Sequence, residues 1–194
     1  HRERVSWDRV HLFWGDERCV PPDDPDSNFR LAQEQLIAPL GIPQTNLHRI
    51  KGELRVPEET AREYESDLTG FFNLQVGELP RFDLILLGLG TDGHTASLFP
   101  SDSSSQEQDR LVIATQSAHA GTQRVSLTLP TINHTRHIFF LISGAEKSEA
   151  ALAVLEASGE GVPFPARLVE PIDGDLRFYL DQPAASRLSG HKMD

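Results

Sequence analysis

An aspartate and a histidine two residues apart, Asp92 and His94, follow an aliphatic run and a series of glycines. Histidine titrates near neutral pH and can act as a general base or acid, and a neighbouring carboxylate can hold its ring and stabilise the imidazolium. The glycines at 88, 90 and 93 permit a tight turn at the end of a strand. The pair predicts acid–base chemistry at this turn, with a merely hydrogen-bonded turn histidine as the alternative.

The same glycines formally match the dinucleotide-binding pattern G-x-G-x-x-G. That pattern requires a long helix directly after the glycines and an acidic residue about 20 residues further on. Pro100 interrupts any long helix, and the next strand-like run ends in Thr115-Gln116. The dinucleotide interpretation is therefore disfavoured.

Charged residues also lie beside three other strand-like runs. Asp16 and Arg18 follow the first run of the chain, and Arg124 opens a later one. Lys147 begins a helix, where a cation opposes the helix dipole unless an anion binds there. Ligands of open α/β sheets collect beyond the carboxyl ends of the strands. Arg18, Arg124 and Lys147 are therefore candidate ligands of an anionic substrate, with Asp16 beside Arg18 in the same segment, although solvated surface charge would explain each one taken alone.

The elements that must position these residues alternate between strands and helices. A continuous aliphatic run at 84–87 is typical of a strand buried on both faces, whereas the alternating run at 125–129 indicates a strand that lies nearer an edge or has one wetter face. Ser27 can cap a helix that Pro39 ends. The alternation predicts one α/β domain over residues 1–194 with a largely parallel sheet. We expect strands at 10–14, 84–87, 111–114, 125–129, 138–142 and 178–180, and helices at 28–38, 57–72 and 146–157.

The composition excludes several kinds of partner. The formal charge is 18 − 29 = −11, which disfavours a nucleic-acid backbone or an anionic membrane. No apolar run reaches the length of about 20 residues that crosses a bilayer. The single cysteine, Cys19, excludes an internal disulfide and indicates a reducing compartment, which we take to be the cytoplasm. His134 and His137 lack further ligands nearby, so no metal is indicated. The oligomeric state is not indicated.

The residues and their order resemble the 6-phosphogluconolactonase family, which belongs to a superfamily shared with glucosamine-6-phosphate deaminases. The deaminases carry Asn-Glu-Pro where this chain has Leu98-Phe99-Pro100, so lactone hydrolysis fits better. The resemblance implies a three-layer Rossmann-like domain and covers nearly the whole chain. The matching segments are G-D-E-R at 15–18, S-N at 27–28, G-x-G-x-D-G-H-T-x-S-L-F-P at 88–100, R-V-S-L-T at 124–128, G-x-x-K at 144–147 and D-x-x-A-A at 181–185.

The resemblance implies hydrolysis of 6-phospho-D-glucono-1,5-lactone to 6-phospho-D-gluconate in the oxidative pentose phosphate pathway, without a metal or organic cofactor. It implies that His94 activates water and that Asp92 orients the region around His94. It further implies that Arg18 contacts the substrate, with Asp16 shaping its loop, and that Arg124 and Lys147 bind the 6-phosphate. An isomerase or deaminase on the same fold, or a sugar-phosphate-binding module without catalysis, remains the alternative.

One part of the family pattern is missing from the sequence. Family members carry an N-terminal strand followed by a Ser-Gly-Gly phosphate-binding loop, and this chain opens at His1 without either. We therefore expect the chain to be N-terminally incomplete, and phosphate binding to be weakened or lost.

Overall fold

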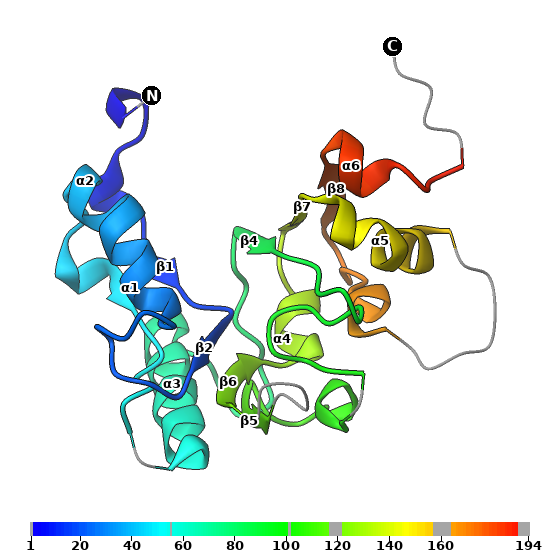
Figure 1. Ribbon diagram of the computed structural model, residues 1–194. Helices are drawn as coiled ribbons and strands as arrows, with labels where there is room; N and C mark the ends of the chain where they lie inside the picture. The colour runs from blue at the N-terminus through cyan, green and yellow to red at the C-terminus, as the bar shows by residue number, and fades with distance from the viewer. Residues whose placement is uncertain (1, 55, 101, 117–121, 157–163, 190–194) are drawn as a thin grey trace. The chain divides into compact units, whose positions relative to one another are not determined.

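The computed structural model describes residues 2–54, 56–100, 102–116, 122–156 and 164–189 (Figure 1). The chain divides into two compact units. Unit 1 comprises residues 1–73 and 112–126, and unit 2 comprises residues 74–111 and 127–194. The expectation of a single domain over residues 1–194 stays a prediction. None of the described helices is long and apolar enough to cross a membrane.

Unit 1 is built around the helix α3, which the sequence predicts correctly over residues 57–72. Pro57 opens α3 with Glu58 and Glu59 in the first turn, where a proline needs no hydrogen-bond acceptor and acids complement the helix dipole. Tyr64 and Leu68 of α3 are among the most deeply buried side chains of the described chain. The helical segments of unit 1 are η1 (Arg2–Arg4), η2 (Trp7–Arg9), α1 (Asn28–Ala32), the π-helical η3 (Gln33–Ile37), α2 (Ala38–Leu40), η4 (Gln44–Asn46) and α3 (Pro57–Phe72).

The first helical stretch begins as predicted but ends later. Ser27 caps α1, because its hydroxyl accepts the backbone N–H of Arg30. The expectation that Pro39 ends the helix is wrong, because the chain stays helical to Leu40 and ends at Gly41, whose φ is 68°. The π-helical turn η3 ends at Ile37, and Pro39 follows in the first turn of α2, where a residue without an N–H is tolerated.

The strands of unit 1 form two small groups. β1 (Leu12–Phe13) pairs in parallel with β3 (Leu47–His48), and β2 (Asp16–Arg18) pairs antiparallel with β6 (Gln123–Leu127), which also neighbours β5 (Val112–Gln116). The expectation of an edge strand at 125–129 is wrong. β6 is the central strand of its sheet, and Val125, Ser126 and Leu127 are all buried. Its alternating polar residue is a small buried serine, so the alternation does not mark a solvent-facing side.

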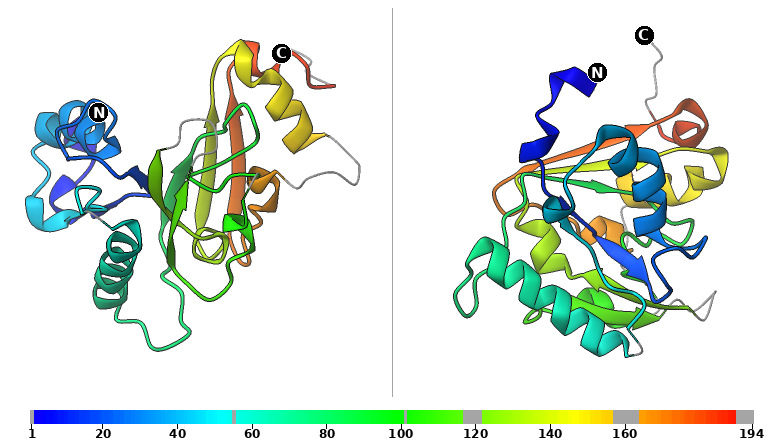
Figure 2. Two further views of the ribbon diagram at one scale, coloured as in Figure 1. Left: turned by 60° about the horizontal axis from the view of Figure 1, so that its bottom comes forward. Right: turned by 90° about the vertical axis from the view of Figure 1, so that its left-hand side faces the viewer.

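Unit 2 contains a parallel three-stranded sheet in the order β4-β7-β8, whose strands lie side by side in Figure 2. Ile138 and Phe140 of β7 are fully buried on one face of this sheet. On the other face, Leu84 and Leu86 of β4 are exposed, so the expectation of burial on both faces is wrong for this strand. The elements of unit 2 are β4 (Leu84–Leu87), η5 (Ser104–Gln106), α4 (Leu129–Asn133), β7 (His137–Ile142), η6 (Ala145–Lys147), α5 (Ser148–Leu155), η7 (Pro165–Leu168), β8 (Asp175–Leu180) and α6 (Gln182–Ala185).

The predicted α/β class is confirmed. Two of the paired groups are parallel, and helices alternate with strands along much of the chain. The pairing of β2 with β6 is antiparallel, so the sheet structure is parallel only in part. The helix expected at 146–157 is observed as η6 followed by α5, and Ala157 lies outside the described residues.

Candidate active site

The turn that follows β4 folds back on itself and is closed by backbone hydrogen bonds. The N–H of Gly90 donates to the carbonyl of His94 at 2.8 Å, and the N–H of Gly93 donates to the carbonyl of Gly90 at 3.0 Å. Gly93 has a φ of 82°, a conformation that a residue with a side chain rarely adopts. The hydroxyl of Thr95 ties the turn back to the end of β4 by donating to the carbonyl of Gly88.

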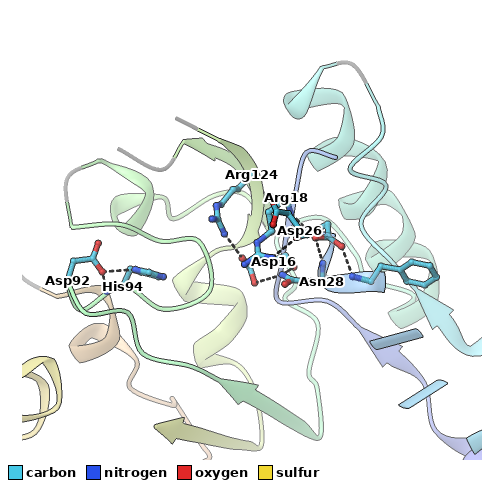
Figure 3. A network of polar contacts seen from close by, with 9 residues as sticks. Asp16, Arg18, Asp26, Asn28, Asp92, His94 and Arg124 are labelled. Atoms are coloured by element: carbon cyan, nitrogen blue, oxygen red, sulfur yellow. Dashed lines mark hydrogen bonds and ion pairs between the residues drawn. The ribbon is translucent and has the colours of Figure 1, made fainter. Parts of the chain in front are cut away.

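Within this turn, Asp92 holds His94 by two contacts (Figure 3). Nδ1 of His94 lies 2.6 Å from Oδ1 of Asp92, and the backbone N–H of His94 donates to the same oxygen at 3.2 Å. A hydrogen bond from Nδ1–H to a carboxylate leaves Nε2 as the basic nitrogen of the ring. Both side chains are about one third exposed, so the pair is accessible from solvent. The arrangement can accept a proton at Nε2 and stabilise the resulting imidazolium.

The charge of Asp92 is favoured by the same contacts. Partial burial acts to raise the pKa of the Asp92 carboxyl, but hydrogen bonds from the ring and the backbone N–H of His94 outweigh it and hold the pKa below its ordinary value. The carboxylate is therefore ionised at neutral pH and can balance a positive charge on the imidazole.

The packing around the pair leaves little room for movement. A Cβ atom at Gly90 would overlap with Nδ1 of His94 and lie 2.6 Å from Oδ1 of Asp92, so only glycine lets the two side chains sit there. A Cβ atom at Gly93 would overlap with the ring of Phe164. The ring of Phe99, which is buried, lies 4.9 Å from the ring of His94.

Lys147 lies in a second loop of unit 2, at the end of β7. Because β4 and β7 are parallel neighbours, the loops at their carboxyl ends leave the same edge of the sheet. The Ser143-Gly144 turn before Lys147 is held by Asp181, which accepts from the Ser143 hydroxyl at 2.5 Å and from the Gly144 N–H. Lys147 is half-buried at the N-cap of α5, as the sequence predicts for a residue at this helix start.

The remaining predicted residues, Asp16, Arg18 and Arg124, come together in unit 1. Arg18 and Arg124 are register partners across β2 and β6, so both project from the same face of the pair. Arg124 Nη1 lies 3.8 Å from Oδ2 of Asp16, and Arg18 Nη1 donates to the carbonyl of Asp26 at 2.5 Å (Figure 3). The Arg18 Nε atom is buried and forms no hydrogen bond with any residue of the described chain.

The charge of the Arg124 guanidinium is disfavoured by its surroundings. Desolvation lowers the pKa of Arg124 first, and the positive charge of Arg18 lowers it further, while Asp16 and other acids act in the opposite direction. An arrangement in which two partly desolvated arginines face each other suits an anion with several oxygens.

Two residues that hold the predicted site residues in place, Glu17 and Asp181, were not identified from the sequence. Glu17 was noted only as part of the G-D-E-R segment, and the structure buries it beneath Asp16 and Arg18. The alternation of a strand could have revealed it, because a residue between two outward-facing side chains points inward. Asp181 was noted only as part of the C-terminal D-x-x-A-A segment. Within the described residues, no cluster of three or more His, Cys, Asp or Glu could hold a metal ion.

The fold and the site define an α/β protein with an acid–base turn at a strand end. Residues 1–178 match the family described as glucosamine-6-phosphate isomerases/6-phosphogluconolactonase, and the chain belongs to this family. It is 41% identical over 187 residues to a 6-phosphogluconolactonase of Synechocystis sp., covering 96% of this chain and 77% of that one. It is 36% identical to a 6-phosphogluconolactonase of Haemophilus influenzae over 188 residues, with 97% and 78% covered.

A solved structure shows the same likeness in three dimensions. The 6-phosphogluconolactonase from Trypanosoma brucei superimposes with a TM-score of 0.80 at 33% identity, covering 91% of this chain and 73% of that one. The likeness confirms the predicted family and fold class.

Proposed function

We infer that the chain is a lactone hydrolase that converts 6-phospho-D-glucono-1,5-lactone to 6-phospho-D-gluconate, a step of the oxidative pentose phosphate pathway. The observation that carries the inference is the Asp92–His94 pair at the end of β4 in a chain of this family. Its substrate is a small phosphorylated sugar lactone. The single cysteine supports the proposal that the protein works in the reducing environment of the cytoplasm.

We propose that His94 is the general base. Nε2 of His94 takes a proton from water as the water oxygen forms a bond to C1 of the lactone. The carbonyl becomes a tetrahedral oxyanion, which collapses with cleavage of the bond between C1 and the ring oxygen. His94 then returns the proton to the ring oxygen as the latter leaves. Asp92 keeps Nδ1 protonated and stabilises the imidazolium between the two transfers.

The proposed roles of the cations follow from their surroundings. Arg18 keeps a buried Nε–H that no described residue accepts, which supports a contact with the substrate or with negative charge that develops on it. Arg124, partly desolvated and facing Arg18, and Lys147, at the N-terminus of α5, are proposed to bind the 6-phosphate. Asp16 is proposed to hold Arg124 and the loop of Arg18 in place.

The residue beside His94 supports hydrolysis over sugar-ring deamination. Phe99 packs its ring 4.9 Å from the His94 ring, at the position where the sequence pattern of the deaminases has a glutamate. A phenyl ring cannot exchange a proton with the imidazole. We therefore expect no release of ammonia from glucosamine 6-phosphate under conditions in which the phosphorylated lactone is hydrolysed.

The test is the turnover of freshly generated 6-phosphogluconolactone, followed by proton release and corrected for spontaneous hydrolysis. His94→Ala should lower kcat by about 10²-fold or more, the typical contribution of a general base. His137→Ala is the matched control, because His137 is an exposed histidine at the opposite end of the sheet, in the first position of β7. Turnover of the His94→Ala variant at the wild-type rate would remove His94 from the mechanism.

A further inference from the structure

The carboxylate of Glu17 is buried in unit 1 and accepts hydrogen bonds from four donors. Oε1 accepts from the backbone N–H of Arg18 at 2.8 Å and from that of Asn28 at 2.7 Å. Oε2 accepts from the hydroxyl of Ser27 at 3.1 Å and from the backbone N–H of Phe29 at 2.7 Å. The residue is 2% exposed, so it is screened from any ligand. All four partners are uncharged groups, so the carboxylate serves as an acceptor for backbone and hydroxyl donors.

These contacts make Glu17 the N-terminal acceptor of α1 from a distant strand. The first N–H groups of a helix have no acceptor within the helix. Glu17 takes those of Asn28 and Phe29, and the Ser27 hydroxyl takes that of Arg30. The negative charge also complements the helix dipole at this end. One side chain of β2 therefore fixes where the helix starts.

The four hydrogen bonds that Glu17 accepts from Arg18, Ser27, Asn28 and Phe29 are called the clamp below, and further contacts connect the clamp to both arginines. Asn28, whose backbone Glu17 holds, donates through its side chain to the backbone carbonyl of Asp16 at 3.0 Å and to its carboxylate at 3.3 Å. Asp16 is the carboxylate that faces Arg124. The carbonyl of Asp26, two residues before Asn28 in the clamped loop, accepts from Arg18.

We propose that Glu17 is a positioning residue for substrate binding: it touches no substrate but fixes the loop at 24–29, and through that loop it sets the directions of Arg18 and Arg124. The proposal rests on the proposed function, in which these arginines contact the phosphorylated lactone. Because Asp16 and Arg18 face one side of β2 and Glu17 the other, loss of the carboxylate would disturb the arginines from beneath without removing any group that meets the ligand.

The test is Glu17→Gln, which preserves the shape of the side chain. Its amide nitrogen cannot accept a hydrogen bond, so one of the two oxygen positions would face two donors with a donor of its own. We expect KM for the phosphorylated lactone to rise about tenfold or more, the range set by a lost hydrogen bond to a charged group, while kcat changes less. An unchanged KM in the folded variant would overturn the proposal.

Asn46→Asp is the matched control for general destabilisation of unit 1. Asn46 is also buried, and its side-chain amide donates to the carbonyls of Asp8 and Val10, so the aspartate would face two acceptors with acceptors of its own. This variant should lower the thermal midpoint by a similar amount and leave KM unchanged. An equal rise of KM in both variants would show that only stability is involved, and would overturn the proposal.

Two further measurements keep the proposal separate from folding and from the proposed function. If Glu17→Gln does not fold, Asn28→Ala serves instead, because it removes only the side-chain hydrogen bonds to Asp16. KM for the phosphorylated lactone should then rise in Asn28→Ala, and an unchanged KM would count against the clamp. The Nε–H resonances of Arg18 and Arg124, assigned with Arg→Lys variants, report on positioning without substrate. The resonances are compared between the wild type and Glu17→Gln. If they shift and the wild type hydrolyses no lactone, the proposed function alone is rejected. If they do not shift and the wild type hydrolyses the lactone normally, the role of Glu17 is rejected.

Discussion

Oδ1 of Asp92 lies 2.6 Å from Nδ1 of His94 and also accepts the backbone N–H of the same histidine. One carboxylate oxygen thus holds both the ring and the main chain of the residue it serves. The consequence is that His94 has one orientation and one basic nitrogen before any substrate arrives.

Asp92→Asn should lower kcat while leaving the fold intact. An amide can present its nitrogen to the ring, which favours the opposite tautomer, and it cannot balance the charge of the imidazolium. We expect a loss of about 10²-fold or more in kcat with a small change in KM. Steady-state kinetics with the phosphorylated lactone measure this, and kcat within about threefold of wild type would contradict the role of Asp92.

Asp92 should also contribute a pH-dependent part of the stability. Because hydrogen bonds from His94 hold the folded-state pKa of Asp92 below its unfolded value, the contribution is complete above the unfolded pKa of about 4 and is lost as the pH falls through the lower folded pKa. Urea unfolding of wild type and Asp92→Asn between about pH 7 and pH 3 should show that the difference in their free energies of unfolding becomes smaller as the pH falls. A difference that stays constant over the range would contradict the stabilising role of the Asp92 carboxylate.

Gly90→Ala should damage catalysis more than folding. The added methyl group would overlap with Nδ1 of His94, so the ring must move, and a misplacement of about 1 Å can cost about 10²-fold in rate. Gly88→Ala is the control in the same turn, because a Cβ atom there meets nothing within 4 Å. Kinetics and urea unfolding of both variants separate the effect on catalysis from the effect on stability. Similar kcat values for the two variants would argue against close packing of the His94 ring over Gly90.

Lys147→Ala should weaken binding of the phosphorylated lactone specifically. Removal of a hydrogen bond to a charged group costs about 1.5–3 kcal/mol, so KM should rise about tenfold or more. Hydrolysis of unphosphorylated glucono-1,5-lactone should be unaffected. Lys51→Ala, which removes a lysine that pairs with Glu63 on the surface of unit 1, is the control. An equal effect on the two lactones would remove Lys147 from phosphate binding.

The sequence predicts the strand ends better than the environment of the strands. The turn at 88–94 could be located because glycine spacing, an acid and a histidine combine there after an aliphatic run. The burial of β4 and β6 was predicted wrongly, because a single strand's pattern does not reveal its neighbours: Leu86 is exposed, whereas Ser126 is fully buried. Periodicity reports on one chain segment, whereas burial depends on which segments pack against it.

For the helices too, features set by local sequence signals were predicted and features set by packing were not. The extent of α3 follows from local signals, a proline and two acids at its start. The continuation of the helical stretch from α1 through η3 into α2, which contains Pro39, does not follow from them, because a π-helical turn depends on packing that propensity cannot express. The four hydrogen bonds of Glu17 join residues ten to twelve positions apart as well as its chain neighbour, so no local motif announces them.

The pairing of Arg18 with Arg124 across β2 and β6 has a consequence for the empty enzyme. The positive charge of Arg18 disfavours that of Arg124, nearby acids such as Asp16 offset this repulsion in part, and an anion bound by both arginines as proposed would offset it further while the chain is folded. By mass action, an anionic ligand then shifts the unfolding equilibrium by an amount that grows with its concentration relative to Kd. With Arg18 and Arg124 binding the phosphorylated lactone as proposed, the substrate and the product should both stabilise the folded protein, and the stability of unit 1 should rise with the concentration of sugar phosphate.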